Sequence, residues 1–174
     1  IKKKGTPTMG GLAFILSVAI SLILVALFFL FNRDYYVAIS LIISLSYALL
    51  NGLIGVFDDI KKLRHRQNAG LSPKQKLVLQ FLCAVLFLAA RRFLLNDSTE
   101  ISFSFGYFDL GIFYYPISLI ILLGIVNSAN LTDGIDGLAS SVAFSIGISL
   151  FYISAALSTE SALLSSALIG ATVG

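Results

Sequence analysis

The chain has 174 residues, of which 57% are hydrophobic and 12% are charged, with a formal net charge of +3 and a mean hydropathy of +0.94. A soluble globular domain carries about 25% charged residues, so this composition excludes that class of protein. It indicates a chain that resides in a lipid bilayer.

Six apolar stretches follow one another along the chain, at residues 9–32, 36–57, 75–92, 113–130, 138–158 and 161–174. A helix needs roughly 20 apolar residues to cross the hydrocarbon of a bilayer. We therefore predict an all-α polytopic membrane protein with five complete transmembrane helices and one truncated helix, forming a single transmembrane domain over residues 1–174. The sixth stretch has about 14 residues after Glu160, too few for a comfortable crossing at about 1.5 Å per residue. We therefore expect the chain to be a fragment of a larger protein.

The basic residues predict the orientation of these spans. Nine of the twelve precede the first span or lie between the second and third spans, and the other three are Arg33, Arg91 and Arg92. By the positive-inside rule, the segments that hold the nine face the cytoplasm. Counting crossings from there places residues 127–137, between the fourth and fifth spans, on the cytoplasmic side as well.

A short polar and aromatic segment, EISFSFGYFDLGI at residues 100–112, lies on the opposite side. Ile101 and Phe103 alternate with serines and the pattern breaks at Gly106, which is the period-two signature of a hairpin. We predict an external β-hairpin near the membrane surface. The alternative is an irregular interfacial loop with an aromatic belt.

Four acidic residues lie at the cytoplasmic ends of predicted spans. Asp58 and Asp59 follow the second span in GVFDDIKK, and Asp133 and Asp136 follow the fourth. Acids near the midplane would favour the ion pathway of a transporter, whereas acids and lysines gathered at one interface favour a site where a polar substrate meets a lipid. The alternative for the adjacent pair is a solvated helix end.

A polar stripe recurs every three residues at the end of the fourth span, at Asn127, Asn130, Asp133 and Asp136. On a helix these residues share one face. Their amides suit a base or a sugar, and their carboxylates suit a cation or hydroxyl groups. Gly134 permits close approach of a ligand to the backbone. The alternative is a polar loop with helix caps.

Four motifs in order resemble those of the bacterial phospho-N-acetylmuramoyl-pentapeptide transferases, of the polyprenyl-phosphate N-acetylhexosamine-1-phosphate transferase superfamily. They are KKKGTPTMGG at 2–11, FDD at 57–59, GLSPKQK at 70–76 and NSANLTDGIDGLA at 127–139. The first and third motifs favour this family over relatives that transfer GlcNAc phosphate to a polyprenyl phosphate. Those relatives remain one alternative function, and a polytopic transporter is another from a different class.

The resemblance implies transfer of phospho-MurNAc-pentapeptide from its UDP donor to undecaprenyl phosphate, with Mg²⁺ as cofactor and UMP as the second product. It also implies about ten spans, a homodimer, a bacterial cytoplasmic membrane with the active site on the cytoplasmic face, and sensitivity to nucleoside inhibitors. No nucleic-acid partner is expected. Because family residues lie outside the chain, we expect this fragment alone to be inactive.

Motif position implies the roles of individual residues. Asp58 and Asp59 are the implied catalytic residues, and Asp59 and Asp136 are implied metal ligands, with a main metal aspartate expected beyond Gly174. The implied substrate-binding residues are Lys3, Thr6, Thr8, Lys74, Asn127, Asn130, Asp133, Gly134 and Asp136.

The chemistry of the acceptor refines these roles. A phosphate monoester has a second pKa of about 6, so at pH 7 it is mostly dianionic and has little proton to give to a base. We therefore favour carboxylates that position Mg²⁺ or the lysines Lys3 and Lys74, with general-base catalysis second. A covalent aspartyl-phosphate route stays open.

Overall fold

The computed structural model describes residues 10–65, 70–103, 106–132, 137–155 and 158–173. Its contacts divide the chain into two compact units. One comprises Ile1–Leu41 and Ser140–Gly174, and the other comprises Ile42–Ala139.

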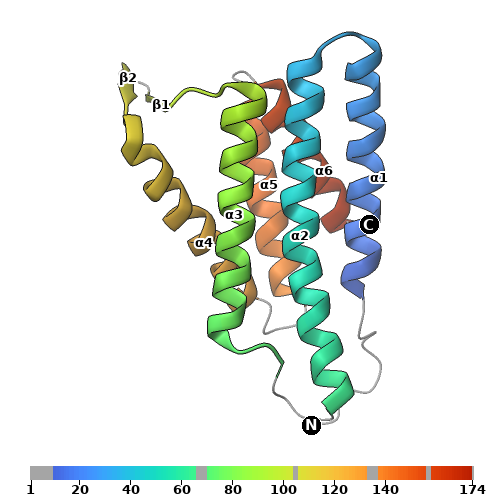
Figure 1. The fold of residues 1–174 in the computed structure, drawn as a ribbon. Coiled ribbons are helices and arrows are strands. Elements are labelled where there is room, and N and C mark those ends of the chain that lie inside the picture. The colour runs from blue at the N-terminus through green and yellow to red at the C-terminus, as the bar shows by residue number, and fades with distance from the viewer. Residues whose placement is uncertain (1–9, 66–69, 104–105, 133–136, 156–157, 174) are drawn as a thin grey trace. The chain divides into compact units, whose positions relative to one another are not determined.

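Helices make up most of the described residues, as Figure 1 shows. In chain order the elements are α1 (Gly10–Phe31), α2 (Tyr35–His65), α3 (Pro73–Leu95), β1 (Glu100–Phe103), β2 (Gly106–Asp109), the 3-10 helix η1 (Gly111–Phe113), α4 (Tyr114–Thr132), α5 (Leu138–Ser154) and α6 (Thr159–Val173).

Four stretches among the described residues are long and apolar enough to cross a membrane: Phe14–Phe31, Tyr35–Lys61, Pro73–Leu95 and Gly111–Asn130. Helix α5 is apolar but has only 17 residues. Many large apolar side chains on these helices are exposed, as expected where lipid replaces water around a helix. The predicted all-α membrane fold is confirmed, whereas the exact span limits and the crossings by α5 and α6 stay predictions.

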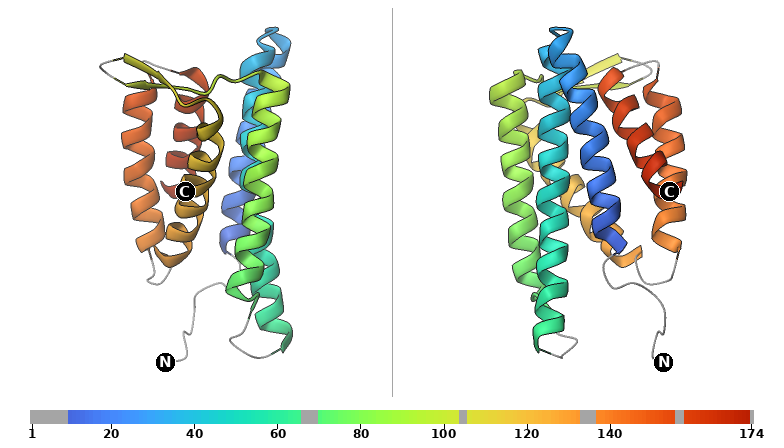
Figure 2. Two further views of the ribbon diagram at one scale, coloured as in Figure 1. Left: turned by 60° about the vertical axis from the view of Figure 1, so that its left-hand side comes forward. Right: turned by 90° about the vertical axis from the view of Figure 1, so that its right-hand side faces the viewer.

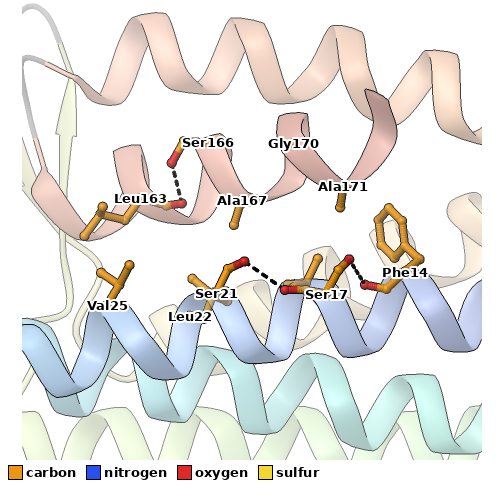
Figure 3. Close-up of a pocket in the computed structure, with 11 residues that line it drawn as sticks. Phe14, Ser17, Ser21, Leu22, Val25, Leu163, Ser166, Ala167, Gly170 and Ala171 are labelled. Atoms are coloured by element: carbon orange, nitrogen blue, oxygen red, sulfur yellow. Dashed lines mark hydrogen bonds between the residues drawn. The ribbon is translucent and has the colours of Figure 1, made fainter. Parts of the chain in front are cut away.

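In the first unit, α1 and α6 flank a groove of about 740 Å³ (Figure 3). Its hydroxyl groups are satisfied within their own helices, because Ser17 donates to the Phe14 carbonyl at 2.9 Å and Ser166 to the Leu163 carbonyl at 2.8 Å. Small residues also bring α5 close to α6. A Cβ atom at Gly147 would lie 2.9 Å from the Cγ1 atom of Ile169. Helices α5 and α6 therefore approach closely at Gly147, as is common for small residues between membrane helices.

In the second unit, α3 runs antiparallel to α2, and the two lie side by side in Figures 1 and 2. Two contacts join them. The ring centroids of Tyr47 and Phe87 lie 4.8 Å apart, and the Lys76 ammonium group contacts the Asp58 carboxylate. The members of these pairs are eleven residues apart on each helix, so one register accounts for both contacts.

The predicted hairpin is confirmed. Strands β1 and β2 pair antiparallel, with Glu100 opposite Asp109. The Asp109 carboxylate accepts hydrogen bonds from the Thr99 hydroxyl at 2.5 Å and the Gly111 N–H at 2.9 Å, and these lower its pKa below the usual value. Asp109 thus joins the hairpin to the 3-10 helix that precedes α4. The external position of the hairpin stays a prediction.

Candidate functional site

The acidic pair Asp58–Asp59 lies within a helix, because α2 continues to His65, two turns beyond the last predicted residue of the second span. The apolar stretch ends at residue 57, but lysine, arginine and leucine are good helix formers and extend the helix past the acids. Successive residues on a helix point about 100° apart. Accordingly Asp58 is buried, with 4% of its surface exposed, whereas Asp59 is exposed.

The Asp58 carboxylate is held on both oxygen atoms. Its Oδ2 atom lies 2.8 Å from the Nζ atom of Lys76, and its Oδ1 atom accepts a 2.7 Å hydrogen bond from the Leu71 backbone N–H. The Lys76 side chain is 31% exposed, so it is only partly buried beside Asp58. The result is a buried carboxylate that orients a partly exposed cation.

The GLSPKQK motif explains why the chain places Leu71 and Lys76 there. Ser72 caps α3 by accepting a hydrogen bond from the Gln75 N–H, and the Gln75 side chain accepts one from the Ser72 N–H. Pro73 occupies the first helical turn, where its missing N–H costs nothing. Gly70 has no room for a side chain, since a Cβ atom would lie 2.2 Å from the Asp58 Oδ1 atom. The capped helix start and the glycine together bring this segment against α2.

Lys76 is a site residue that the sequence reasoning missed, because it assigned Lys74 instead. Lys74 is exposed, and it is Lys76 that contacts Asp58. The structure separates the two lysines through the rotation of α3. Lys76 lies four residues before Gln80, which begins the buried i+4 series of α3 with Ala84 and Leu88. That periodicity places Lys76, and not Lys74, on the face of α3 that packs within the protein.

The first half of the predicted polar stripe lies in the last three turns of α4. The Asn127 Nδ2 atom donates to the Leu123 carbonyl at 2.8 Å, and the Asn130 Nδ2 atom donates to the Val126 carbonyl at 3.1 Å. Their Oδ1 atoms accept no hydrogen bond from a described residue. Each side chain is therefore fixed by its own helix and still presents an acceptor.

Six predicted site residues lie outside the described residues: Lys3, Thr6, Thr8, Asp133, Gly134 and Asp136. Within the described residues, no group of three histidine, cysteine, aspartate or glutamate side chains could hold a metal ion. Of the two predicted metal ligands, Asp59 and Asp136, only Asp59 lies among the described residues. Its roles in metal binding and catalysis stay predictions.

Three buried oxygen atoms in the second unit have no hydrogen-bond partner among the described residues: Tyr47 Oη, Asn51 Oδ1 and Gln80 Oε1. Gln80 is only 2% exposed and lies one turn further along α3 from Lys76. Buried polar atoms of this kind are usually paired, often with an ordered water. A polar layer therefore continues from the Asp58–Lys76 pair into the contact between α2 and α3.

Comparison with known proteins identifies the class to which this fold and site belong. The family model described as Glycosyl transferase family 4 matches residues 41–174, and the phospho-N-acetylmuramoyl-pentapeptide-transferase signature 1 matches residues 3–15. The chain therefore belongs to glycosyl transferase family 4. Within it, the chain resembles the phospho-N-acetylmuramoyl-pentapeptide transferases, as the four motifs predict.

Individual relatives support this assignment. The phospho-N-acetylmuramoyl-pentapeptide-transferase of Thermoanaerobacter sp. (strain X514) is 42% identical over 147 residues, which cover 83% of this chain and 43% of the relative. That of Halalkalibacterium halodurans is 38% identical over 176 residues, covering 99% and 52%. That of Streptococcus pneumoniae serotype 2 (strain D39) is 44% identical over 151 residues, covering 86% and 42%. The chain thus spans about half the length of the relatives it matches.

Proposed function

We propose that the full-length protein transfers phospho-MurNAc-pentapeptide from UDP-MurNAc-pentapeptide to undecaprenyl phosphate, which yields lipid I and UMP in peptidoglycan synthesis. The observation that carries this proposal is the Asp58–Lys76 pair, held at one end of α2 and α3 by the GLSPKQK motif. The names of the relatives support the same reaction.

The geometry favours a positioning role for Asp58. The reaction brings a lipid phosphate against a diphosphate, so catalysis consists chiefly of neutralising negative charge and aligning the attack. Lys76 supplies a cation, and Asp58 fixes its direction. Because both Asp58 oxygen atoms already accept hydrogen bonds, this carboxylate is a poor candidate for a general base in the described arrangement.

Asp59 suits the second task, which is to hold a divalent cation. Carboxylate oxygen atoms are preferred ligands of Mg²⁺, which usually keeps several waters and also contacts substrate phosphates. In this proposal Asp59 and Asp136 hold the ion, with further ligands from the part of the protein outside this chain. When bound, the ion would neutralise charge on the diphosphate.

The polar stripe would hold the nucleotide end of the donor. The Oδ1 atoms of Asn127 and Asn130 can accept from a base N–H or a sugar hydroxyl. The remaining residues of this proposed donor site are Lys3, Thr6, Thr8, Lys74, Asp133 and Gly134. A nucleoside inhibitor would compete there.

We also propose that this site lies on the cytoplasmic face of a bacterial inner membrane, and that the full-length protein is a homodimer.

An assay of UMP release by the full-length protein tests the proposal. We expect release only when UDP-MurNAc-pentapeptide, undecaprenyl phosphate and Mg²⁺ are all present, and loss of release when the ion is chelated. Asp59→Asn should lower kcat by about a hundredfold or more, the effect of losing one electrostatic stabiliser of a transition state. Glu100→Gln, which removes an acid from the hairpin, is the matched control and should leave kcat unchanged.

Other outcomes would contradict the proposal. Release from UDP-GlcNAc in preference to UDP-MurNAc-pentapeptide would favour the related GlcNAc-phosphate transferases. Flux of a solute across vesicles without UMP release would favour a transporter. Near-normal turnover of Asp59→Asn would remove Asp59 from the catalytic site.

A further inference from the structure

A cavity of about 230 Å³ lies in the second unit, which also holds the Asp58–Lys76 pair. It is found at the end of α3 opposite to Lys76. The last turns of α3, the segment after them and the start of α4 form its walls. Phe87 and Leu88 supply an apolar floor, and Arg91 and Arg92 supply two guanidinium groups. None of these residues belongs to the proposed transferase site.

Arg91 has a structural partner. Its Nε atom lies 2.5 Å from Asp97 Oδ2, and both side chains are largely buried. The N–H groups of Asn96 and Asp97 also bond to the Arg91 carbonyl, with Asn96 in the left-handed conformation that ends the helix. The ion pair therefore fixes the segment after α3 and neutralises one of the two arginines.

Arg92 lacks such a counter-charge among the described residues. Its Nη1 atom donates to the Asn96 side-chain oxygen at 2.9 Å and to the Asp97 backbone carbonyl at 3.2 Å, both of which are neutral acceptors. Its Nε and Nη2 groups donate to no described residue. Asp97 is the only acid in the lining, so the cavity carries an excess positive charge.

Two tyrosines complete the wall on the α4 side. The rings of Tyr114 and Tyr115 meet edge to face, with centroids 5.7 Å apart. Tyrosine is favoured where one end of the ring contacts apolar matter and the hydroxyl remains hydrated, as at a membrane interface. Ser98 adds a small hydroxyl group to the lining.

The side chains around this cavity suit a position near lipid headgroups. Phe93, one residue beyond the arginines, is 84% exposed, and Tyr107 on the neighbouring hairpin is 81% exposed. Large apolar side chains thus extend past the cavity along this end of the unit. Arg91 lies about 22 Å from Lys76 along α3, at about 1.5 Å per residue, which approaches the roughly 30 Å thickness of bilayer hydrocarbon. If α3 crosses the membrane, the arginines therefore lie towards the face opposite to Lys76, where a guanidinium group can bind an anionic headgroup.

We propose that this cavity binds the phosphate group of an anionic membrane lipid, on the bilayer face opposite to the Asp58–Lys76 pair. The Nε and Nη2 groups of Arg92 form a planar fork that matches two phosphate oxygen atoms. The tyrosine hydroxyls lie at the same wall and can donate to the headgroup. The acyl chains would extend over the exposed apolar side chains of α3.

Lipid binding to the full-length protein tests this proposal independently of transferase activity. Native mass spectrometry would count bound lipid, and thermal unfolding in nanodiscs would report stabilisation, with phosphatidylglycerol compared with phosphatidylcholine and with inorganic phosphate. The variants are Arg92→Gln, which removes the charge, and Arg92→Lys, which keeps the charge but not the fork. Arg33→Gln is the matched control, because it removes the arginine between α1 and α2 on the same predicted face.

We expect the wild type to prefer phosphatidylglycerol and Arg92→Gln to bind it about tenfold more weakly, the loss of roughly one charge-assisted contact. Arg92→Lys should fall between them, and Arg33→Gln should bind as the wild type does. Equal binding of phosphatidylglycerol by the wild type and Arg92→Gln would overturn the proposal. So would equal stabilisation by inorganic phosphate, or an equal loss in Arg33→Gln. Because Arg92→Lys retains the cation, it decides the matter if Arg92→Gln does not fold.

Discussion

Asp58 illustrates how one buried carboxylate depends on its partners. Removing an ion from water costs several kcal/mol, and only close contacts offset this cost. The contacts of Asp58 include the Lys76 ammonium group and the Leu71 N–H. Removing Lys76 alone is therefore more damaging than removing both charges, because the buried carboxylate loses a cationic partner.

Thermal unfolding of full-length variants measures this dependence. Lys76→Met should destabilise the protein by about 3 kcal/mol, because the buried Asp58 carboxylate loses the ammonium group that it contacts. The double variant Asp58→Asn/Lys76→Met should be more stable than the sum of the single effects predicts. Lys74→Met, two residues away and exposed, is the control and should change stability by about 0.5 kcal/mol or less. Additive effects at Asp58 and Lys76 would show that the pair contributes no coupling energy.

Asn130 offers a second test at the scale of single residues, through the kinetics of the proposed reaction. If its Oδ1 atom binds the donor equally in the ground and transition states, Asn130→Ala should raise the donor KM about tenfold and leave kcat unchanged. The affinity of a uridine-containing inhibitor should fall in parallel. Ser128→Ala, on another face of α4, is the control. A change in thermal stability with unaltered KM and inhibitor affinity would make the polar stripe structural only.

At the scale of the helices, two glycines near the contact between α2 and the start of α3 have opposite surroundings. A Cβ atom at Gly70 would lie 2.2 Å from the Asp58 Oδ1 atom, whereas a Cβ atom at Gly55 of α2 would meet nothing within 4 Å. An added methyl group at residue 70 must therefore displace the segment or the carboxylate. At residue 55 it only raises helix propensity.

Gly70→Ala should accordingly lower the unfolding temperature of the full-length protein and reduce kcat for UMP release, since it disturbs the Asp58–Lys76 pair. Gly55→Ala should raise stability by up to about 1 kcal/mol, the usual difference between alanine and glycine inside a helix. Comparison of the two melting curves checks this. An equal response of both variants would show that the close approach at Gly70 has no energetic consequence.

Sequence alone predicts the helices and the hairpin because each follows from a local pattern, an uncharged stretch in one case and a period of two in the other. It does not predict that α2 extends to His65, since hydropathy marks the end of the apolar stretch and not the end of the helix. Nor does it distinguish Lys76 from Lys74 as the partner of Asp58. That contact joins residues 18 positions apart and depends on how α3 is rotated about its axis. The metal ligands are likewise a matter of tertiary arrangement.

At the scale of the whole molecule, the positive-inside rule separates two sets of basic residues. Lys76 and Arg91 lie towards opposite ends of α3, and the hairpin follows the Arg91 end. If α3 crosses the membrane as proposed, these ends face different compartments. Donor binding would then occur on one face and lipid phosphate binding on the other.

Accessibility of introduced cysteines checks this topology in cells that express the full-length protein. With Cys83 replaced by alanine, a membrane-impermeant thiol reagent should label Tyr107→Cys from outside and Ser72→Cys only after the membrane is permeabilised. Both positions are exposed, so protein burial does not limit labelling at either. Labelling of Ser72→Cys in intact cells would reverse the orientation and place the Asp58–Lys76 pair outside.

The shared register of α2 and α3 has a mechanical consequence. The Tyr47–Phe87 contact and the Asp58–Lys76 pair are about 16 Å apart along the helices, at about 1.5 Å per residue, and both are satisfied at one alignment. Sliding either helix by one turn would break both contacts at once, and rotating it would turn Asp58 or Lys76 away from its partner. A motion that admitted or released a substrate by sliding one of these helices along the other would therefore have to break both contacts together.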